Sequence, residues 1–496
     1  MRVTTKMMTN STLMNINNNK QTLAKLDNQY STGQKISRPS EDPVIAVRAL
    51  KLRDNLNQLN QYYERNIPDA KSWMDITEGA LTNINTVLTR VYEQCNQGSN
   101  DPLSAKDRSS IISNLKECVG QIYQEGNSNY AGRYVLTGYK TNTSLIFTED
   151  TNNYNYEITQ NFSGSDIQAA SQIVDCTAYS SYDSTSPSVV SKVPKTTEVY
   201  RIRLAYDDLA STDTSGTALT TINVKIGTTT VAANVVSASS ADAYNFTTGE
   251  DAIQYIPETG ELVFSKTAYD NINQNDTISI TYSKQSFKEY DLRPEHYYDC
   301  KATDLSDGSI KTYTNQGESQ VIDYEINFGQ KLKVNTLAKD AFDSTIAREI
   351  GELYNIVNQV DSLETQIADI DSKLKEKNLT TDQKEALTSM REALDTEYSL
   401  RSKNMHERFA KAMTVTSACQ DQINEAVADL GARYVRLELT ENRLSDQQTE
   451  FEDLLSKNED ADMVETIIKY NSYEAIYNAS LSVAAKTVKN SLLDFL

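Results

Sequence analysis

The sequence has 496 residues, enough for two to four domains. Its formal net charge of −21 argues against a nucleic-acid binder, since no basic patch is concentrated enough to follow a phosphate backbone. No apolar run approaches the length of a membrane span, so we expect no membrane insertion. The N-terminus also lacks the apolar core of a cleaved signal peptide.

Residues 1–42 contain a polar helical segment followed by a non-helical elbow. The apolar positions of the helix recur every three or four residues and are Leu13, Ile16, Leu23, Leu26 and Tyr30. Large apolar side chains are otherwise scarce here. We therefore expect this segment, and its counterpart at the C-terminus, to be disordered in the monomer.

The elbow is carried by seven residues: Gly33, Arg38, Pro39, Ser40, Glu41, Asp42 and Pro43. We expect Gly33 to stop the first helix and the Arg-Pro pair to force extended backbone. Ser40 is the expected N-cap of the next helix. Glu41 and Asp42 would then lie in its first turn, where the helix dipole favours negative charge, and Pro43 is tolerated there.

Residues 43–147 indicate a helical region that closes with a β-hairpin. The clearest apolar stripe is Trp73, Thr77, Ala80, Ile84, Val87, Val91 and Cys95. We expect Pro68 to kink or restart the first long helix, and a second helix to end at Gly126-Asn127. The segment Gly132–Gly138 then predicts a strand bounded by glycines.

Residues 148–325 are rich in Thr, Ser, Tyr and Val and predict one or two small antiparallel β domains. The expected strands are Val199–Tyr206, Thr221–Ile226, Glu261–Ser265, Thr277–Tyr282 and Tyr324–Phe328. Pro257–Gly260 predicts a turn into the third of these. The Ser- and Pro-rich segment Ser180–Pro194 predicts a linker or an exposed loop.

Helical periodicity returns in residues 326–455 and 456–496. The first of these regions contains an additional helical hairpin over 361–405, where Thr380 and Gln383 match a capping box. The apolar stripe of the last helix is Met463, Ile467, Tyr470, Tyr477, Leu481, Val488 and Phe495. The fold class is therefore α+β, with inserted antiparallel β structure between helical ends.

The two terminal helices pack most simply on each other, as a long antiparallel, coiled-coil-like bundle that brings the termini together. Residues 1–36 carry five basic residues against one acidic residue: Arg2, Lys6, Lys20, Lys25 and Lys35 against Asp27. Because residues 460–496 are slightly acidic, we expect charge to favour their pairing. Exposed ion pairs are individually worth less than about 1 kcal/mol.

Several motifs resemble the flagellin-type axial proteins of the bacterial flagellum. The resemblance rests on the opening Met1–Met8, the elbow Arg38–Pro43, and the segments Asn127–Gly138, Glu325–Asn335, Leu430–Glu438 and Glu459–Asp462. It covers about residues 1–147 and 325–496, and the middle of the chain carries none of the family's motifs. The prolines of the elbow are similar to the hook–filament junction branch of the family, whereas filament proteins usually carry alanines and a glycine there.

The resemblance implies a secreted, non-enzymatic structural protein of the hook–filament junction, exported without a cleaved signal peptide. Its partners would be the preceding hook-associated protein, flagellin, further copies of itself in a ring, and an export chaperone. A filament subunit is the nearest alternative. A secreted coiled-coil adhesin or needle-type protein, or an enzyme carried in the middle region, are more distant ones.

The residues with catalytic or metal-binding potential favour simpler structural roles, so we expect no cofactor, metal or catalytic site. His406-Glu407 begins a zinc-peptidase motif, but Ala410 stands where the second histidine is needed. The aspartate-rich segments at 270–276 and 304–308 lack EF-hand spacing. Of the five cysteines, Cys95, Cys118 and Cys419 fall on apolar stripes, which predicts small buried side chains.

Overall fold

The computed structural model describes residues 5–100, 103, 105–176, 178–182, 187–212, 217–240, 243–247, 249–315, 319–376 and 378–493. The chain divides into two compact units. The first comprises Met1–Ala70, Tyr324–Leu332 and Val435–Leu496, and the second comprises Lys71–Asp323 and Lys333–Tyr434. The ends of the chain thus belong to one unit and the β-rich middle to the other.

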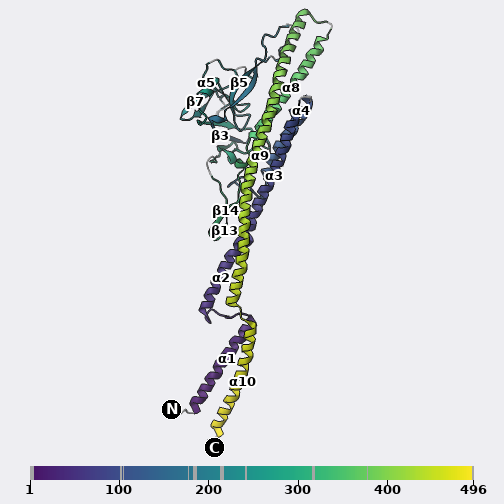
Figure 1. The fold of residues 1–496 in the computed structure, drawn as a ribbon. Coiled ribbons are helices and arrows are strands. Elements are labelled where there is room, and N and C mark those ends of the chain that lie inside the picture. Colours follow the sequence, from purple (N-terminus) through teal and green to yellow (C-terminus); the bar gives the residue numbers. More distant parts are fainter. Residues whose placement is uncertain are drawn as a thin grey trace. The chain divides into compact units, whose positions relative to one another are not determined.

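The helical elements of the described residues confirm long helices at both ends of the chain (Figure 1). The α-helices are α1 (Thr5–Thr32), α2 (Pro43–Gln61), α3 (Ile67–Gly98), α4 (Ala105–Glu125), α5 (Lys266–Asp270), α6 (Pro294–Tyr297), α7 (Ala338–Ala341), α8 (Thr345–Leu374), α9 (Thr381–Glu459) and α10 (Met463–Leu493). A π-helical turn, η1 (Tyr62–Asn66), separates α2 from α3, and short 3-10 turns are η2 (Gly164–Asp166) and η3 (Tyr179–Ser181).

The strands form one large sheet and two small hairpins. They are β1 (Asn129–Tyr130), β2 (Arg133–Tyr134), β3 (Tyr154–Ser163), β4 (Gln168–Val174), β5 (Lys195–Arg203), β6 (Thr221–Ile226), β7 (Thr229–Val235), β8 (Ile253–Ile256), β9 (Glu261–Phe264), β10 (Thr277–Lys284), β11 (Asp299–Asp304), β12 (Ile310–Tyr313), β13 (Asp323–Asn327) and β14 (Gln330–Lys333). Four of the predicted strands are confirmed as β5, β6, β9 and β10, and the fifth as β13.

In the first unit, α1 and α10 run antiparallel and side by side, so the two ends of the chain lie together (Figure 1). The expected disturbance at Pro68 is present as the π-helical turn η1, where the Ile67 N–H bonds to the Tyr62 carbonyl five residues earlier. Pro68 has no N–H and its ring would press on the carbonyl four residues before it. The wider π turn relieves that clash without ending the helix.

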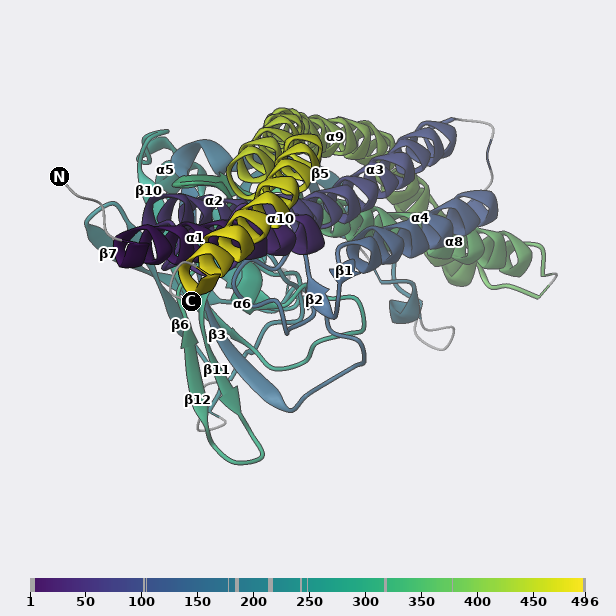
Figure 2. The same ribbon diagram turned by 90° about the horizontal axis from the view of Figure 1, so that it is seen from below.

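In the second unit, the apolar stripe of α3 is buried as predicted, from Trp73 through to Cys95. The next helix in the chain, α4, packs along α8, and Figure 2 shows these two helices next to each other. The Tyr123 hydroxyl of α4 donates to the Asp343 carbonyl at 3.0 Å, just before α8. Gly126 follows the end of α4, as expected.

The large sheet has ten strands in the order β12-β11-β3-β10-β6-β7-β8-β9-β5-β4. It confirms the expected antiparallel β structure in the middle of the chain as one sheet, in which β7 and β8 form a parallel pair. The alternation of buried and exposed residues along β10 is typical of a strand with one covered face. β8 and β9 are buried throughout.

The small hairpin after α4 is shorter than predicted. The segment Gly132–Gly138 contains only the two-residue strand β2, paired with β1, and then continues through bends and turns. The Tyr134 N–H already bonds outside the strand pair, to the Thr141 carbonyl. The Val135 N–H bonds to the Ser128 carbonyl, but no strand continues beyond Tyr134, so the strand prediction was too long.

The additional helical hairpin is confirmed, although its second helix, α9, continues far beyond residue 405. Thr380 and Gln383 form the predicted capping box. The Thr380 N–H donates to the Gln383 side chain at 2.9 Å, and the Gln383 N–H donates to the Thr380 hydroxyl at 3.2 Å. The hairpin core consists of Leu363, Ile370, Leu387, Met390 and Leu394. Tyr179, Tyr182 and Val190, from the irregular segment before β5, pack against this core.

Candidate functional site

The elbow between α1 and α2 begins where Gly33 ends α1, as predicted. Its φ of +70° is a left-handed conformation that suits glycine, and its N–H bonds to the Gln29 carbonyl at 3.0 Å. The main chain then turns at Arg38–Glu41, where the Glu41 N–H bonds to the Arg38 carbonyl. Pro39 occupies the second position of this turn, which its fixed φ favours.

The start of α2 differs from the prediction, because Asp42 rather than Ser40 is the N-cap. An Asp42 carboxylate oxygen accepts the N–H groups of Val44 and Ile45 at 3.0 and 3.2 Å. Pro43 is the first helical residue, where a missing N–H costs nothing. With the cap one position before proline, Ser40 falls in the preceding turn.

Glu41 also lies outside the first turn of α2 and stabilises the elbow instead. Its carboxylate accepts the Ser37 hydroxyl at 2.8 Å and the Ser37 N–H at 3.2 Å. These hydrogen bonds lower the pKa of Glu41. The elbow is therefore ordered by a local acidic contact, in place of the helix-dipole role predicted for this residue.

A second chain crossing, from α9 to α10, is bonded to the elbow through the backbone. The Lys35 N–H bonds to the Glu459 carbonyl at 2.7 Å, and the Ala461 N–H bonds to the Gly33 carbonyl at 2.8 Å. Asp462 caps α10 by accepting two N–H groups at 3.0 Å. These bonds hold the elbow and the α9–α10 crossing next to each other in the first unit.

Within the α1–α10 pair, only part of the predicted apolar set lies in the contact. Ile16 and Leu26 are buried, and Leu23, Tyr470 and Tyr477 are half-buried. The Asn19 amide donates to the Ser480 hydroxyl at 3.2 Å across the pair. The contact is narrow and depends on few large side chains.

The remaining predicted residues do not close this contact. The exposed members of the predicted set are Leu13, Tyr30, Met463, Ile467 and Leu481. The Val488 side chain and Phe495 lie outside the described residues. Between the described parts of α1 and α10 no ion pair is present. The expected charge attraction is thus not expressed as a direct contact there.

A second apolar face of α10 escaped the sequence reasoning. Val464, Ile468, Ile476 and Val483 are all exposed, the first of them by 70%. At about 100° per residue they fall within roughly 120° of one another, away from Thr466, which is buried. Their spacing of four, eight and seven residues was the available signal. We call these four residues the outer face of α10.

The second unit contains a buried charge cluster that the sequence reasoning also missed. Arg201 of β5 donates to both carboxylate oxygens of Glu352 in α8 at 2.7 and 2.8 Å, and Arg203 donates to the same group at 3.0 Å. Arg201 also pairs with Glu261, and Arg203 with Glu349. The cluster ties the sheet to α8. The signal was a pair of glutamates one helical turn apart on the apolar face of α8.

Burial alone would raise the pKa of Glu352. The guanidinium groups of Arg201, Arg408 and Arg203 together outweigh that effect and lower the pKa to about 2. Removing one partner from such a cluster leaves a buried charge without compensation. The cluster is therefore a structural feature that depends on every member.

The residues with catalytic or metal-binding potential have structural roles in the folded chain. The His406 ring lies 3.1 Å from the Ser99 carbonyl, and Trp73 is buried on the α3 stripe. Cys95, Cys118 and Cys419 are buried as predicted, and burial raises the pKa of the Cys95 thiol to about 12. Among the described residues, no group of three or more potential metal ligands was found. Within the same residues, no helix is long and apolar enough to cross a membrane.

Comparison with known proteins assigns the terminal regions. Residues 3–141 match the bacterial flagellin N-terminal helical region, and residues 413–496 match the bacterial flagellin C-terminal helical region. The two matched regions contain the elbow, α1 and α10. The chain thus carries regions similar to both terminal helical regions of bacterial flagellin.

The relatives of this chain include hook-associated proteins. Over 143 residues it is 32% identical to flagellar hook-associated protein 3 of Salmonella typhimurium strain LT2, covering 28% of this chain and 44% of that protein. Over 156 residues it is 31% identical to the protein of that name from Escherichia coli K12, covering 31% and 48% respectively. The chain thus spans less than half the length of these curated relatives.

A solved structure of flagellar hook-associated protein 3 from Legionella pneumophila also aligns with the chain. It is 13% identical, covers 82% of this chain and 97% of that one, and gives a TM-score of 0.30. A score of this size does not establish a shared arrangement.

Proposed function

We propose that this protein is a structural, non-enzymatic subunit of the hook–filament junction in the bacterial flagellum, assembling through α1 and α10. The observation that supports this most strongly is the apolar surface that the α1–α10 pair leaves open. A helix pair that was complete by itself would cover the outer face of α10, yet Val464 and Ile468 face solvent. Assembly buries such a surface against neighbouring subunits.

Exposed apolar side chains on α1 extend the same argument. Met7 and Met14 lie two turns apart on one side of α1, and both are more than half exposed. Methionine side chains adapt to partners of different shape. This property suits a subunit that contacts different proteins on its two sides. The proposed partners are the preceding hook-associated protein, flagellin and further copies of this chain in a ring.

The narrow α1–α10 contact also supports ordering on assembly. Two helices joined by few buried side chains are marginal in water, because the apolar burial hardly exceeds the cost of ordering the backbone. An export chaperone that holds these ends before assembly follows from the same reasoning. The proposed location is the extracellular flagellum, reached by export without a cleaved signal peptide.

Deleting the gene in its native bacterium tests the role. We expect cells with intact hooks, no filaments and flagellin released into the medium. Normal filaments on the deletion cells would contradict the proposal. A filament subunit is the second candidate, supported by the flagellin regions at both ends. The purified protein would then grow long filaments from seeds, which a junction protein does not do.

A matched pair of variants tests the assembly surface itself. Val464→Ser removes an apolar group from the outer face of α10, and Val193→Ser removes an equally exposed one, 67% against 70%, from the irregular segment before β5. Expressed in the deletion strain, Val464→Ser should weaken filament attachment while the secreted level stays normal. Val193→Ser should restore filaments fully. Equal behaviour of the two variants would count against the surface.

A further inference from the structure

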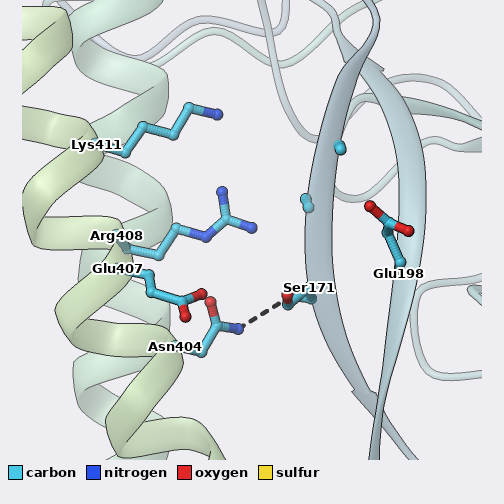
Figure 3. A pocket seen from close by; sticks show the side chains of 8 residues that line it. Ser171, Glu198, Asn404, Glu407, Arg408 and Lys411 are labelled. Atoms are coloured by element: carbon cyan, nitrogen blue, oxygen red, sulfur yellow. Dashed lines mark hydrogen bonds between the residues drawn. The ribbon is translucent and has the colours of Figure 1, made fainter.

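A cavity of about 210 Å³ lies between β4, the edge strand of the sheet, and α9 (Figure 3). Its strand side is formed by Ala169, Ala170 and Ser171. The Arg408 and Lys411 side chains extend from α9 toward the strand in Figure 3. A water occupies about 30 Å³ in the liquid, so the cavity has room for an ion and part of its hydration shell.

The walls of this cavity are fixed by contacts between α9 and the strand. The Asn404 amide donates to the Ser171 carbonyl at 3.1 Å, drawn as the dashed line in Figure 3. About two turns further along α9, the Lys411 ammonium donates to the Gln168 side chain. The helix therefore covers a strand edge that would otherwise expose unpaired backbone groups. Between these contacts the cavity stays open.

Positive charge exceeds negative charge in the cluster behind the cavity. Its described cations are Arg201, Arg203, Arg348, Arg408 and Lys411, and its carboxylates are Glu261, Glu349, Glu352 and Asp207. Five cations thus face four carboxylates, and Asp207 is largely exposed. Among these groups there is one more cation than carboxylate, and two further carboxylates, Glu198 and Glu407, line the cavity itself.

Two cations of the cluster line the cavity, and their ion pairs are longer than those of Arg201. Glu352 accepts two hydrogen bonds from Arg201, while its ion pair with Arg408 is longer, at 3.3 Å. Lys411 lies 3.4 Å from the Glu349 carboxylate. Burial lowers the pKa of both Arg408 and Lys411, and the nearby glutamates offset this lowering only partly. For Arg201, by contrast, Glu261 and Glu352 outweigh the effect of burial and raise the pKa.

Two carboxylates also border the cavity, Glu198 from β5 and Glu407 from α9. Both side chains belong to exposed residues, and Glu198 accepts the Tyr200 hydroxyl at 3.1 Å. Water screens exposed charges efficiently, whereas the Arg408 guanidinium is buried and its field is screened much less. The buried charge in the cavity lining is therefore the cationic Arg408, whereas both carboxylates belong to exposed residues.

We propose that this cavity binds a small oxyanion of the inorganic phosphate class between Arg408 and Lys411. Such an ion would accept charge-assisted hydrogen bonds from both side chains, and its negative charge would lie beside the buried Arg408 guanidinium. It would fasten α9 to the edge of the sheet. This site is independent of the terminal helices and of the proposed junction role.

Calorimetric titration of the full-length protein with potassium phosphate at pH 7, against potassium chloride at equal ionic strength, tests the site. We expect saturable binding of one phosphate per chain. Lys411→Gln should weaken it about tenfold, since one charge-assisted hydrogen bond is lost. Lys403→Gln, which removes an exposed lysine of the same helix, should leave it unchanged.

The sign of the site charge is tested separately with Glu407→Gln. This variant removes a repelling carboxylate from the rim and should strengthen phosphate binding. Weaker binding in Glu407→Gln would overturn the proposal, as would the absence of saturable heat or an undiminished affinity in Lys411→Gln. Near-ultraviolet circular dichroism of each variant, unchanged from the native protein, shows that the fold is retained.

Discussion

Replacing Glu352 by Gln should strongly destabilise the contact between the sheet and α8. The native carboxylate accepts hydrogen bonds from Arg201 and Arg203 and pairs with Arg408. Lowering its pKa from 4.5 to about 2 corresponds to about 3 kcal/mol at neutral pH, at 1.36 kcal/mol per unit. Breaking a buried ion pair by removing one partner typically costs about 3–5 kcal/mol. The pKa shift and the typical cost of a broken buried ion pair thus give similar free-energy losses for Glu352→Gln.

Hydrogen–deuterium exchange is the appropriate assay, because it reports opening of β5 and α8 separately from the rest of the chain. A loss of about 3 kcal/mol corresponds to roughly a hundredfold faster exchange of protected amides in these two elements. The control is Glu385→Gln on α9, which removes an exposed carboxylate and should change nothing. Urea unfolding followed by circular dichroism gives an independent midpoint.

The pH dependence has a defined direction. Because the pKa of Glu352 is lowered on folding, its contribution is present above about 4.5 and is lost as the pH falls toward 2. Glu352→Gln should therefore lack this part of the acid destabilisation. Exchange in β5 within about threefold of the native rate at pH 7 would refute the role assigned to the cluster.

Three further predictions concern other parts of the chain. Burial lowers the pKa of His296 to about 4, so the native fold should lose up to about 3 kcal/mol as the pH falls from 6.5 to 4, and His296→Gln should remove that loss in urea titrations. Asp42→Ala should cost the start of α2 about 1 kcal/mol, measured as faster amide exchange in its first turn, while Asp42→Asn should retain the cap. Gly260→Ala places a Cβ 1.9 Å from the Tyr206 carbonyl oxygen at a φ of +61° and should lower the melting temperature more than Gly227→Ala, which has a similar φ but open space.

Local patterns predicted the helices well, because their determinants lie within a few residues. The α3 stripe from Trp73 to Cys95 is buried, and the Thr380–Gln383 capping box forms where the spacing placed it. The start of α2 was wrong by two residues. An acidic residue directly before proline was already a cap signal, since proline favours the first helical position.

The sheet was less predictable, since its order depends on pairing between distant segments. β3 pairs with both β10 and β11, and β7 with β8 in parallel, and none of these pairings has a local signature. The charged side of β5 has an ordinary solvent-facing pattern in the sequence, with Arg201 and Arg203 alternating with apolar residues. Only the facing glutamates on α8 distinguish it from a solvated surface.

The outer face of α10 lay outside the predicted site for a related reason. A periodicity search favours the strongest single stripe, and Met463, Ile467 and Leu481 belong to that stripe. The contact with α1 is actually centred on a flank of it, where Thr466 is buried. One amphipathic pattern therefore could not specify two separate contact surfaces on the same helix.

The backbone bonds between the two chain crossings have a mechanical consequence. Lys35 is bonded to Glu459, and Gly33 to Ala461, so neither crossing can bend by itself. A load applied along α1 would therefore pass to α10 through these bonds. Because main-chain groups make the bonds, most side-chain substitutions at the two crossings would leave this transmission of force intact.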